Sequence, residues 1–296
     1  RLQIKEIRMA RTFTNENNYP HWLYHTLTTN NYSKGTRPSD ISVTRLIDSP
    51  QVNQLRFEHA NELVEDVRDR VWSIWGSAVH SVVENTNESN SDVLTEKRFY
   101  NDYDGKVVTG QIDVYDMSSR ILYDVKTVSA WNLVNGYKKS WEYQLNVLAD
   151  LMVANAWKVK GLAIVAIARD WNARQASDVE TYPKHAMTVV DIPLWIPSIR
   201  KKYIDQQLSR HFKEDPYCTP EERWQSEEKW AVMKEGRKNA LRLTDSETAA
   251  KKYIIDLLDP TKAYIEHREG SPKRCWSYCN VRDFCPQLRA ERQEKR

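Results

Sequence analysis

A short, uninterrupted apolar segment constrains the fold of this chain more than any other feature of its sequence. Residues 160–168, KGLAIVAIA, contain no polar side chain after the initial lysine. A run of this length and composition is typical of a strand that is buried on both faces, as the strands of a helix-covered sheet are. The segment therefore predicts a central strand of an α/β sheet.

The segments on either side alternate between helix and strand patterns. Apolar residues at helical spacing predict a helix over residues 57–85. Three strands are expected next, over 96–102, 106–116 and 120–129, with turns at 104–105 and 117–120. A helix over 131–156, a strand over 186–194 and further helices complete the pattern. This order predicts an α/β core that is followed by a helical extension.

The length of 296 residues suits one or two domains. We expect a helical and irregular segment at 1–55, in which Ser42 begins a short helix, a core at 56–200 and a helical region at 201–296. No apolar run approaches the roughly 18 residues of a membrane span, and the N-terminus lacks a secretory signal. A cytoplasmic protein without a membrane partner is therefore expected. Its net charge of +3 is compatible with a nucleic-acid partner.

Two carboxylates and a lysine stand out on the expected strands. Asp124 and Lys126 are two residues apart, so a strand projects them from the same face. If the strands over 106–116 and 120–129 pair as a hairpin, Asp113 lies beside Asp124. Neighbouring carboxylates repel each other unless a cation joins them, and oxygen ligands favour Mg²⁺ or Mn²⁺. The alternative is a solvated face with two acids and a salt-bridged lysine.

A histidine on the expected helix over 57–85 is a further candidate. Gly76, His80 and Glu84 are each four residues apart and therefore share one face of that helix. A lone helical histidine is more often structural than a metal ligand. The role of His80 therefore depends on which residues face this side of the helix.

Four cysteines are present, and three of them fall close together near the C-terminus. They are Cys218, Cys275, Cys279 and Cys285. In a reducing cytosol such a group indicates a metal site before a disulfide framework. Thiolates bind iron–sulfur clusters or Zn²⁺, and His267 is a candidate fourth ligand for zinc. Plain buried thiols are the remaining alternative.

Taken together, these motifs resemble the PD-(D/E)XK nuclease superfamily, in particular its RecB-like exonuclease branch. GQIDVYD and ILYDVKT resemble its catalytic strands, and Gly76, His80 and Glu84 match its G-x-x-x-H-x-x-x-E helix. Gln144 lies where the branch carries its Q-x-x-x-Y motif, although Leu148 replaces the tyrosine. The cysteines resemble those of iron–sulfur members, including the CRISPR adaptation nuclease, the AddB subunit and stand-alone phage proteins. The resemblance spans about residues 40–290.

The resemblance implies a restriction-endonuclease-like core, in which helices flank a central mixed sheet, and a C-terminal extension stapled by a metal cluster. It makes His80, Asp113, Asp124 and the Val125 carbonyl ligands of Mg²⁺ or Mn²⁺, and Glu84 a residue that supports them. It makes Lys126 the catalytic lysine and gives Gln144 the task of holding that lysine or the DNA.

The resemblance also implies a 4Fe–4S cluster, with zinc as the alternative, on the four cysteines. In related nucleases the remote cysteine usually lies near the segment that matches residues 42–55. This chain has no cysteine there, which leaves Cys218 as the candidate.

The function expected from this resemblance is metal-dependent cleavage of DNA. An exonuclease is favoured over an endonuclease, acting on single strands or duplex ends in phage-type recombination, repair or genome processing. Recombination or replication proteins are candidate partners, and a phage-encoded protein would work in the cytoplasm of the bacterial host. The alternatives are a CRISPR-adaptation-like nuclease that trims captured DNA, and a non-catalytic DNA-binding scaffold on a nuclease fold.

Overall fold

The computed structural model describes residues 12–29, 37–134, 136–212 and 216–294. Contacts divide the chain into two units, Arg1–Pro216 and Tyr217–Arg296. The domain boundaries expected after residues 55 and 200 instead fall inside helices α3 (Pro50–Glu58) and α7 (Pro197–His211). Within the described residues no helix has the length and apolarity needed to span a membrane. The N-terminal residues 1–11, for which no secretory signal is expected, lie outside the described part.

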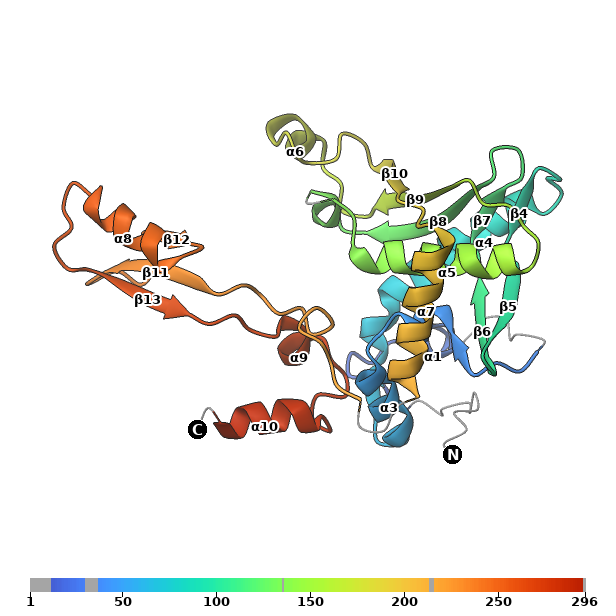
Figure 1. Ribbon diagram of the computed structural model, residues 1–296, viewed down its shortest axis with the longest axis horizontal. Helices are drawn as coiled ribbons and strands as arrows, with labels where there is room; N and C mark the ends of the chain where they lie inside the picture. Colours follow the sequence, from blue (N-terminus) through green and yellow to red (C-terminus); the bar gives the residue numbers. More distant parts are fainter. Residues whose placement is uncertain (1–11, 30–36, 135, 213–215, 295–296) are drawn as a thin grey trace. The chain divides into compact units, whose positions relative to one another are not determined.

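A five-stranded mixed sheet forms the centre of the first unit, in the order β10-β9-β8-β7-β4 (Figure 1). Its strands are β4 (Val93–Thr95), β7 (Val114–Asp116), β8 (Ile121–Val128), β9 (Gly161–Ala168) and β10 (Met187–Ile192). β8 and β9 run parallel, and all other neighbours are antiparallel. The apolar run is β9, between two partner strands, which confirms the predicted central strand and the α/β class.

A second, three-stranded sheet has the order β2-β6-β5. Its strands are β2 (Ile41–Ser42), β5 (Arg98–Tyr103) and β6 (Lys106–Gln111). The turn between β5 and β6 is at Asp104–Gly105, as predicted, and both residues have positive φ. The uninterrupted strand expected over 106–116 was wrong. The chain leaves this sheet at Ile112, whose N–H donates to the Lys97 carbonyl, and joins the central sheet at Val114.

Helix α5 (Lys139–Ala154) contacts strands of both sheets and carries much of the core (Figure 1). Its buried residues include Leu145, Leu148 and Leu151. The short helix α2 (Val43–Leu46) and α7 pack against α5. Ser42 caps α2 by accepting a hydrogen bond from the Arg45 N–H, so the helix start predicted at Ser42 is confirmed.

Gly110 of β6 lies against side chains of this core. A Cβ atom at this position would lie 2.5 Å from Leu148 Cδ2 and 2.7 Å from Val43 Cγ2. Gly110→Ala should therefore destabilise the fold by about 1–3 kcal/mol, the usual range for overpacking a core. Urea unfolding would measure this, with Gly105→Ala as a comparison: no atom lies within 4 Å of its Cβ, and only its positive φ opposes alanine. Equal stability of wild type and Gly110→Ala would contradict the packing described.

The helix expected over 57–85 begins later than predicted. After α3 the chain forms β3 (Val64–Asp66) and a 3₁₀ turn η1 (Val67–Arg70), and only then α4 (Val71–Asn87). β3 pairs in parallel with β1 (Thr12–Thr14), and the Asp66 carboxylate accepts hydrogen bonds from Thr14 Oγ1 and the N–H of Glu16. These long-range contacts override the local helical pattern. The remaining elements of this unit are α1 (His21–Thr28), η2 (Ala130–Leu133) and α6 (Ala173–Asp178).

The second unit is not purely helical, contrary to the prediction for 201–296. It contains a three-stranded antiparallel sheet in the order β12-β11-β13, and α8 (Glu247–Ile255) packs on all three strands. The strands are β11 (Lys229–Lys234), β12 (Arg242–Thr244) and β13 (Ala263–Arg268). Two further helices, α9 (Lys273–Ser277) and α10 (Pro286–Glu294), follow. One of the further helices expected in this region corresponds to α8.

Candidate active site

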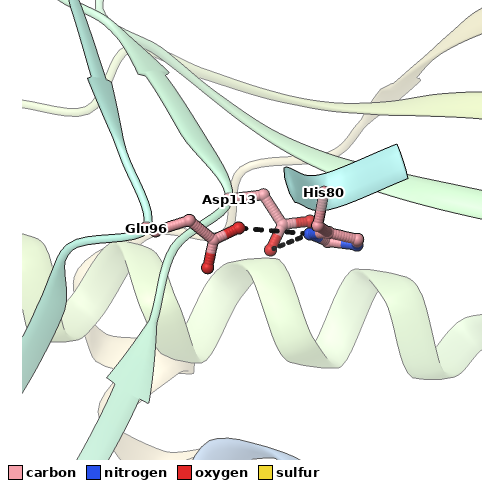
Figure 2. A group of neighbouring side chains, drawn as sticks. All are labelled: His80, Glu96 and Asp113. Atoms are coloured by element: carbon pink, nitrogen blue, oxygen red, sulfur yellow. Dashed lines mark hydrogen bonds and ion pairs between the residues drawn. The ribbon is translucent and has the colours of Figure 1, made fainter. Parts of the chain in front are cut away.

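Three side chains from separate parts of the first unit converge at one point (Figure 2). His80 comes from α4, Glu96 from the connection between β4 and β5, and Asp113 from the break between β6 and β7. His80 Nδ1 lies 3.2 Å from Glu96 Oε1 and 3.6 Å from Asp113 Oδ1. One ligand atom from each residue lies within 4.8 Å of the other two. This spacing is short enough for one cation to bind all three.

The strand register places Asp113 next to the β8 pair. β7 and β8 are antiparallel with Val114 opposite Tyr123, so Asp113 is level with Asp124. The Val125 N–H donates a 2.7 Å hydrogen bond to Asp113 Oδ2. Burial, reinforced by the negative charge of Asp124, raises the pKa of Asp113 to about 7. The protein thus holds two acids together where their charges repel, an arrangement that a bound cation would relieve.

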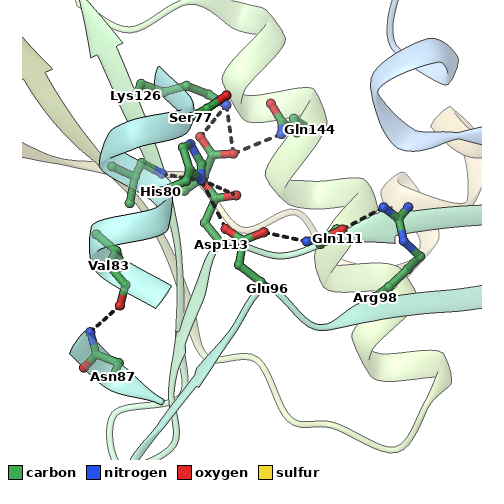
Figure 3. A network of polar contacts seen from close by, with 12 residues as sticks. Ser77, His80, Val83, Asn87, Glu96, Arg98, Gln111, Asp113, Lys126 and Gln144 are labelled. Atoms are coloured by element: carbon green, nitrogen blue, oxygen red, sulfur yellow. Dashed lines mark hydrogen bonds and ion pairs between the residues drawn. The ribbon is translucent and has the colours of Figure 1, made fainter. Parts of the chain in front are cut away.

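Asp124 is held through its carboxylate by two side chains, those of Lys126 and Gln144, both of which are labelled in Figure 3. Its carboxylate is 1% exposed. Lys126 Nζ lies 2.9 Å from Oδ1 and 2.8 Å from Oδ2, and Gln144 Nε2 of α5 donates to Oδ1 at 2.9 Å. Within the described residues, Oδ2 accepts no hydrogen bond of regular geometry, although the lysine ammonium is close to it. Asp124 therefore keeps an oxygen that could bind a further positive charge.

Lys126 combines a fixed position with access to solvent. It lies two residues after Asp124 on β8, and its side chain is 26% exposed. The ammonium therefore neutralises a buried carboxylate while one side stays open to a ligand. A phosphate approaching the site from solvent could be contacted by this group.

His80 is polarised by its acidic neighbours. The hydrogen bond with Glu96 raises the pKa of His80, and the charge of Asp113 acts in the same direction against the opposing effect of burial. The imidazole is thereby held between two carboxylate oxygens, so that its orientation toward the acid cluster is fixed.

Glu96 is the site residue that the sequence analysis missed. Its Oε2 accepts a hydrogen bond from Gln111 Nε2, and Gln111 in turn accepts one from Arg98, so the carboxylate is held in place (Figure 3). Its backbone has φ 47°, a conformation that non-glycine residues rarely adopt and that is often found at functional sites. The only sequence signal is an acid at the start of the strand expected over 96–102, next to the expected strand that carries Asp113.

Other residues predicted for the site lie as follows. Glu84 is exposed and, in the described part of the chain, forms no hydrogen bond or ion pair with His80. Val125 contacts Asp113 through its N–H. Leu148, at the position of the family tyrosine, is buried in the core against Gly110. Its side chain therefore lies in the core and is not available to a DNA strand.

The side chains present fit a hard divalent cation. One imidazole and two carboxylates already lie at coordinating distance of one another. Asp124 is not part of this group, but its carboxylate is buried and level with Asp113 across the strand pair. Oxygen-rich ligand sets of this kind suit Mg²⁺ or Mn²⁺ better than softer metals. The donor chemistry thus supports a metal site at this position.

The substitution Glu96→Gln tests whether Glu96, which was not predicted from the sequence, is a metal ligand. The substitution keeps the shape of the side chain but removes a charged ligand, so Mn²⁺ affinity should fall at least about tenfold. Titration calorimetry would measure this. Glu84→Gln, on the exposed side of α4, should leave the affinity unchanged. If both variants bind Mn²⁺ as the wild type does, Glu96 is not a ligand.

All four cysteines lie in the second unit. Cys218, Cys275 and Cys285 are buried, Cys279 is half-buried, and none forms a disulfide. The Arg223 guanidinium donates to Cys275 Sγ at 3.5 Å and forms a bidentate ion pair with Glu291. No three cysteine sulfurs lie within 4.8 Å of one another in the described chain.

Comparison with known proteins gives distant likenesses. No protein-family model and no curated protein matches the chain. The crystal structure of SSO0001 is similar over 68% of this chain and 86% of that chain, with 15% identity and a TM-score of 0.43. A phage related exonuclease from Haemophilus somnus 129PT is similar over 64% of this chain and 79% of that chain, with 15% identity and a TM-score of 0.24. At these values neither likeness establishes the fold or the function.

Proposed function

We propose that this chain is a divalent-metal-dependent DNA nuclease, and that it acts as an exonuclease. The observation that carries the proposal is the convergence of His80, Glu96 and Asp113 beside the Asp124–Lys126 pair. Acidic ligands for a hard cation, next to a lysine that is open to solvent, are suited to hydrolysing a phosphodiester. The order of the motifs, which resembles the RecB-like exonuclease branch, supports DNA as the substrate.

In this proposal His80, Glu96, Asp113 and Asp124 hold the cation, with the Val125 carbonyl as a further ligand. A bound Mg²⁺ or Mn²⁺ would acidify a water molecule and polarise a phosphate oxygen. Lys126 neutralises charge that develops on the phosphate or orients the attacking water. Gln144 keeps the Asp124 carboxylate and, through it, the lysine in position.

A cleavage assay tests the proposal directly. Single- and double-stranded oligonucleotides, labelled at the 5′ or the 3′ end, are incubated with Mg²⁺ or Mn²⁺ and resolved on a denaturing gel. An exonuclease gives a ladder or a single mononucleotide from one end, whereas an endonuclease gives internal fragments. A preference for strand ends would fit phage-type recombination, repair or genome processing, with recombination or replication proteins as partners. Absence of cleavage with both metals would favour a non-catalytic DNA-binding scaffold.

We further propose that Cys218, Cys275, Cys279 and Cys285 hold a 4Fe–4S cluster that stabilises the second unit. Four thiols without a disulfide suit a reducing cytoplasm. A single zinc ion would bring its thiolates to roughly 3.8 Å of one another, given Zn–S bonds of about 2.3 Å in a tetrahedron. No three of these sulfurs lie within 4.8 Å of one another in the part of the chain that the structure describes. A cluster allows wider spacing because each thiolate binds a different iron.

The expected result is a brown protein after purification without oxygen, with about four iron atoms per chain. Elemental analysis and visible absorption would measure this. Cys279→Ser should lower the thermal stability of the second unit, because binding of a structural metal group is folding free energy. Stoichiometric zinc without iron would instead support the zinc alternative. A protein that contains neither metal would support the alternative of plain buried thiols.

A further inference from the structure

Helix α4 exposes large aromatic side chains beside the candidate active site. Trp72 is 55% exposed and Trp75 is 52% exposed, and no residue of α4 is fully buried. Trp72 precedes His80 by eight residues, which is about 12 Å along a helix axis. This distance equals three to four stacked nucleotides at the roughly 3.4 Å spacing of bases along a strand.

A cation lies over one of these rings. Arg169 Cζ is 4.2 Å from the centroid of the Trp72 ring. Arg169 directly follows β9, and its N–H donates to the Val128 carbonyl at the end of β8. β8 is the strand that carries Lys126, so the Trp72–Arg169 pair lies at the end of the catalytic strand. Trp131, which follows this strand in η2, is also exposed.

The positive charges at this end of the sheet are not neutralised by ion pairs. Desolvation and the positive charge of Arg169 both lower the pKa of Lys138, the residue that directly precedes α5. In the described residues neither Arg169 nor Lys138 forms a salt bridge with a carboxylate. The adjacent acid, Asp170, accepts hydrogen bonds from Ser129 Oγ and the Ala130 N–H. The patch therefore combines exposed tryptophans and two cations with one carboxylate, Asp170, on which the charge of Arg169 also acts. The excess of positive charge suits a phosphate backbone with accessible bases.

We propose that Trp72 and Arg169 form a subsite that stacks an unpaired base of the DNA strand whose phosphodiester lies at Lys126. The inference rests on the proposed function and specifies its substrate as a strand with unpaired bases. Exposed tryptophans and guanidinium planes stack on bases without regard to sequence, and a base pair inside a duplex does not expose its face. Lys138 would contact a phosphate of the same strand.

Fluorescence anisotropy with labelled dT20 and a blunt 20-base-pair duplex, without divalent metal, tests the subsite. Trp72→Ala should weaken dT20 binding by roughly five- to 150-fold, the range for losing one base stack. Arg169→Gln should weaken it in the same direction. Lys138→Gln should lower the salt dependence of dT20 binding by about 0.7 in log–log slope, as loss of one phosphate contact requires. Trp22→Ala, at an exposed tryptophan on α1, is the matched control and should bind as the wild type does.

The outcomes separate the subsite from the nuclease proposal. Weaker dT20 binding by Trp72→Ala but not by Trp22→Ala supports the subsite, even if the wild type cleaves no DNA. If Trp72→Ala and Arg169→Gln bind dT20 within twofold of the wild type while the wild type cleaves DNA, the subsite is overturned and the nuclease proposal stands. Equal losses of affinity for duplex and dT20 in these variants would also overturn the subsite. A wild-type protein that binds only duplex would do the same.

Discussion

Replacing Lys126 with alanine should reduce DNA cleavage by at least about a hundredfold, the scale for removing one preorganised charged group, and leave Mn²⁺ binding intact. Lys126 is not one of the proposed ligands, and after its loss Gln144 still holds the Asp124 carboxylate, so the substitution mainly removes a positive charge from the site. Affinity for DNA should remain close to that of the wild type, because many phosphate contacts each contribute a part of the binding free energy.

Single-turnover cleavage and calorimetry with Mn²⁺ on the same preparations measure the two effects. Lys201→Ala is a matched control, since Lys201 also pairs with an aspartate but is exposed on α7. It should cleave at the wild-type rate. A Lys126→Ala variant that cleaves DNA at a rate within threefold of the wild type would show that the lysine has no part in the cleavage reaction.

Asp113→Asn should abolish both Mn²⁺ binding and cleavage, yet it should not weaken the metal-free fold. Asparagine keeps the shape and can still accept the hydrogen bond from the Val125 N–H. Burial raises the pKa of Asp113 to about 7, which means that the folded protein disfavours the charged form. Removing the charge should therefore leave the free energy of unfolding unchanged or higher, a trade of stability for function that is common at active sites.

Asp66→Asn is the informative comparison, because Asp66 is also buried but its environment has the opposite effect. Hydrogen bonds from the Glu16 N–H and Thr14 Oγ1 lower the pKa of Asp66, so its charge stabilises the fold. This variant should unfold at lower urea concentration and bind Mn²⁺ normally. If Asp113→Asn instead loses stability and keeps Mn²⁺ affinity, Asp113 is a structural residue.

The parts of the site that the sequence predicted are those that depend on one strand pair. The spacing of Asp113, Asp124 and Lys126 needs only a tight turn at 117–120 and the two-residue period of a strand. Glu96 was missed because it lies outside any regular element. Its carboxylate reaches the site through an unusual backbone φ and a hydrogen bond from Gln111, neither of which leaves a pattern in the sequence.

The same distinction explains the errors in the fold. The start of α4 was misplaced because Asp66 and β3 are fixed by contacts with residues about fifty positions earlier. The sheet of the second unit pairs β11 with β13, more than thirty residues apart, across an intervening helix. Periodicity within a short window carries no information about such partners. It was sufficient for β9, because an uninterrupted apolar run is by itself the pattern of a strand inside a sheet.

The register between β7 and β8 also limits which insertions and deletions the turn between these strands can accept. Side chains alternate between the two faces of a strand, so one residue added to the turn at 117–120 would shift Asp113 from the level of Asp124 to that of a residue on the opposite face. Insertions and deletions that a surface turn ordinarily tolerates are therefore constrained here, and this turn should keep its length while its residue types drift. The hairpin turn at Asp104–Gly105 falls under the same restriction, because the β5–β6 register places Arg98 opposite Gln111 and keeps Glu96 level with Asp113.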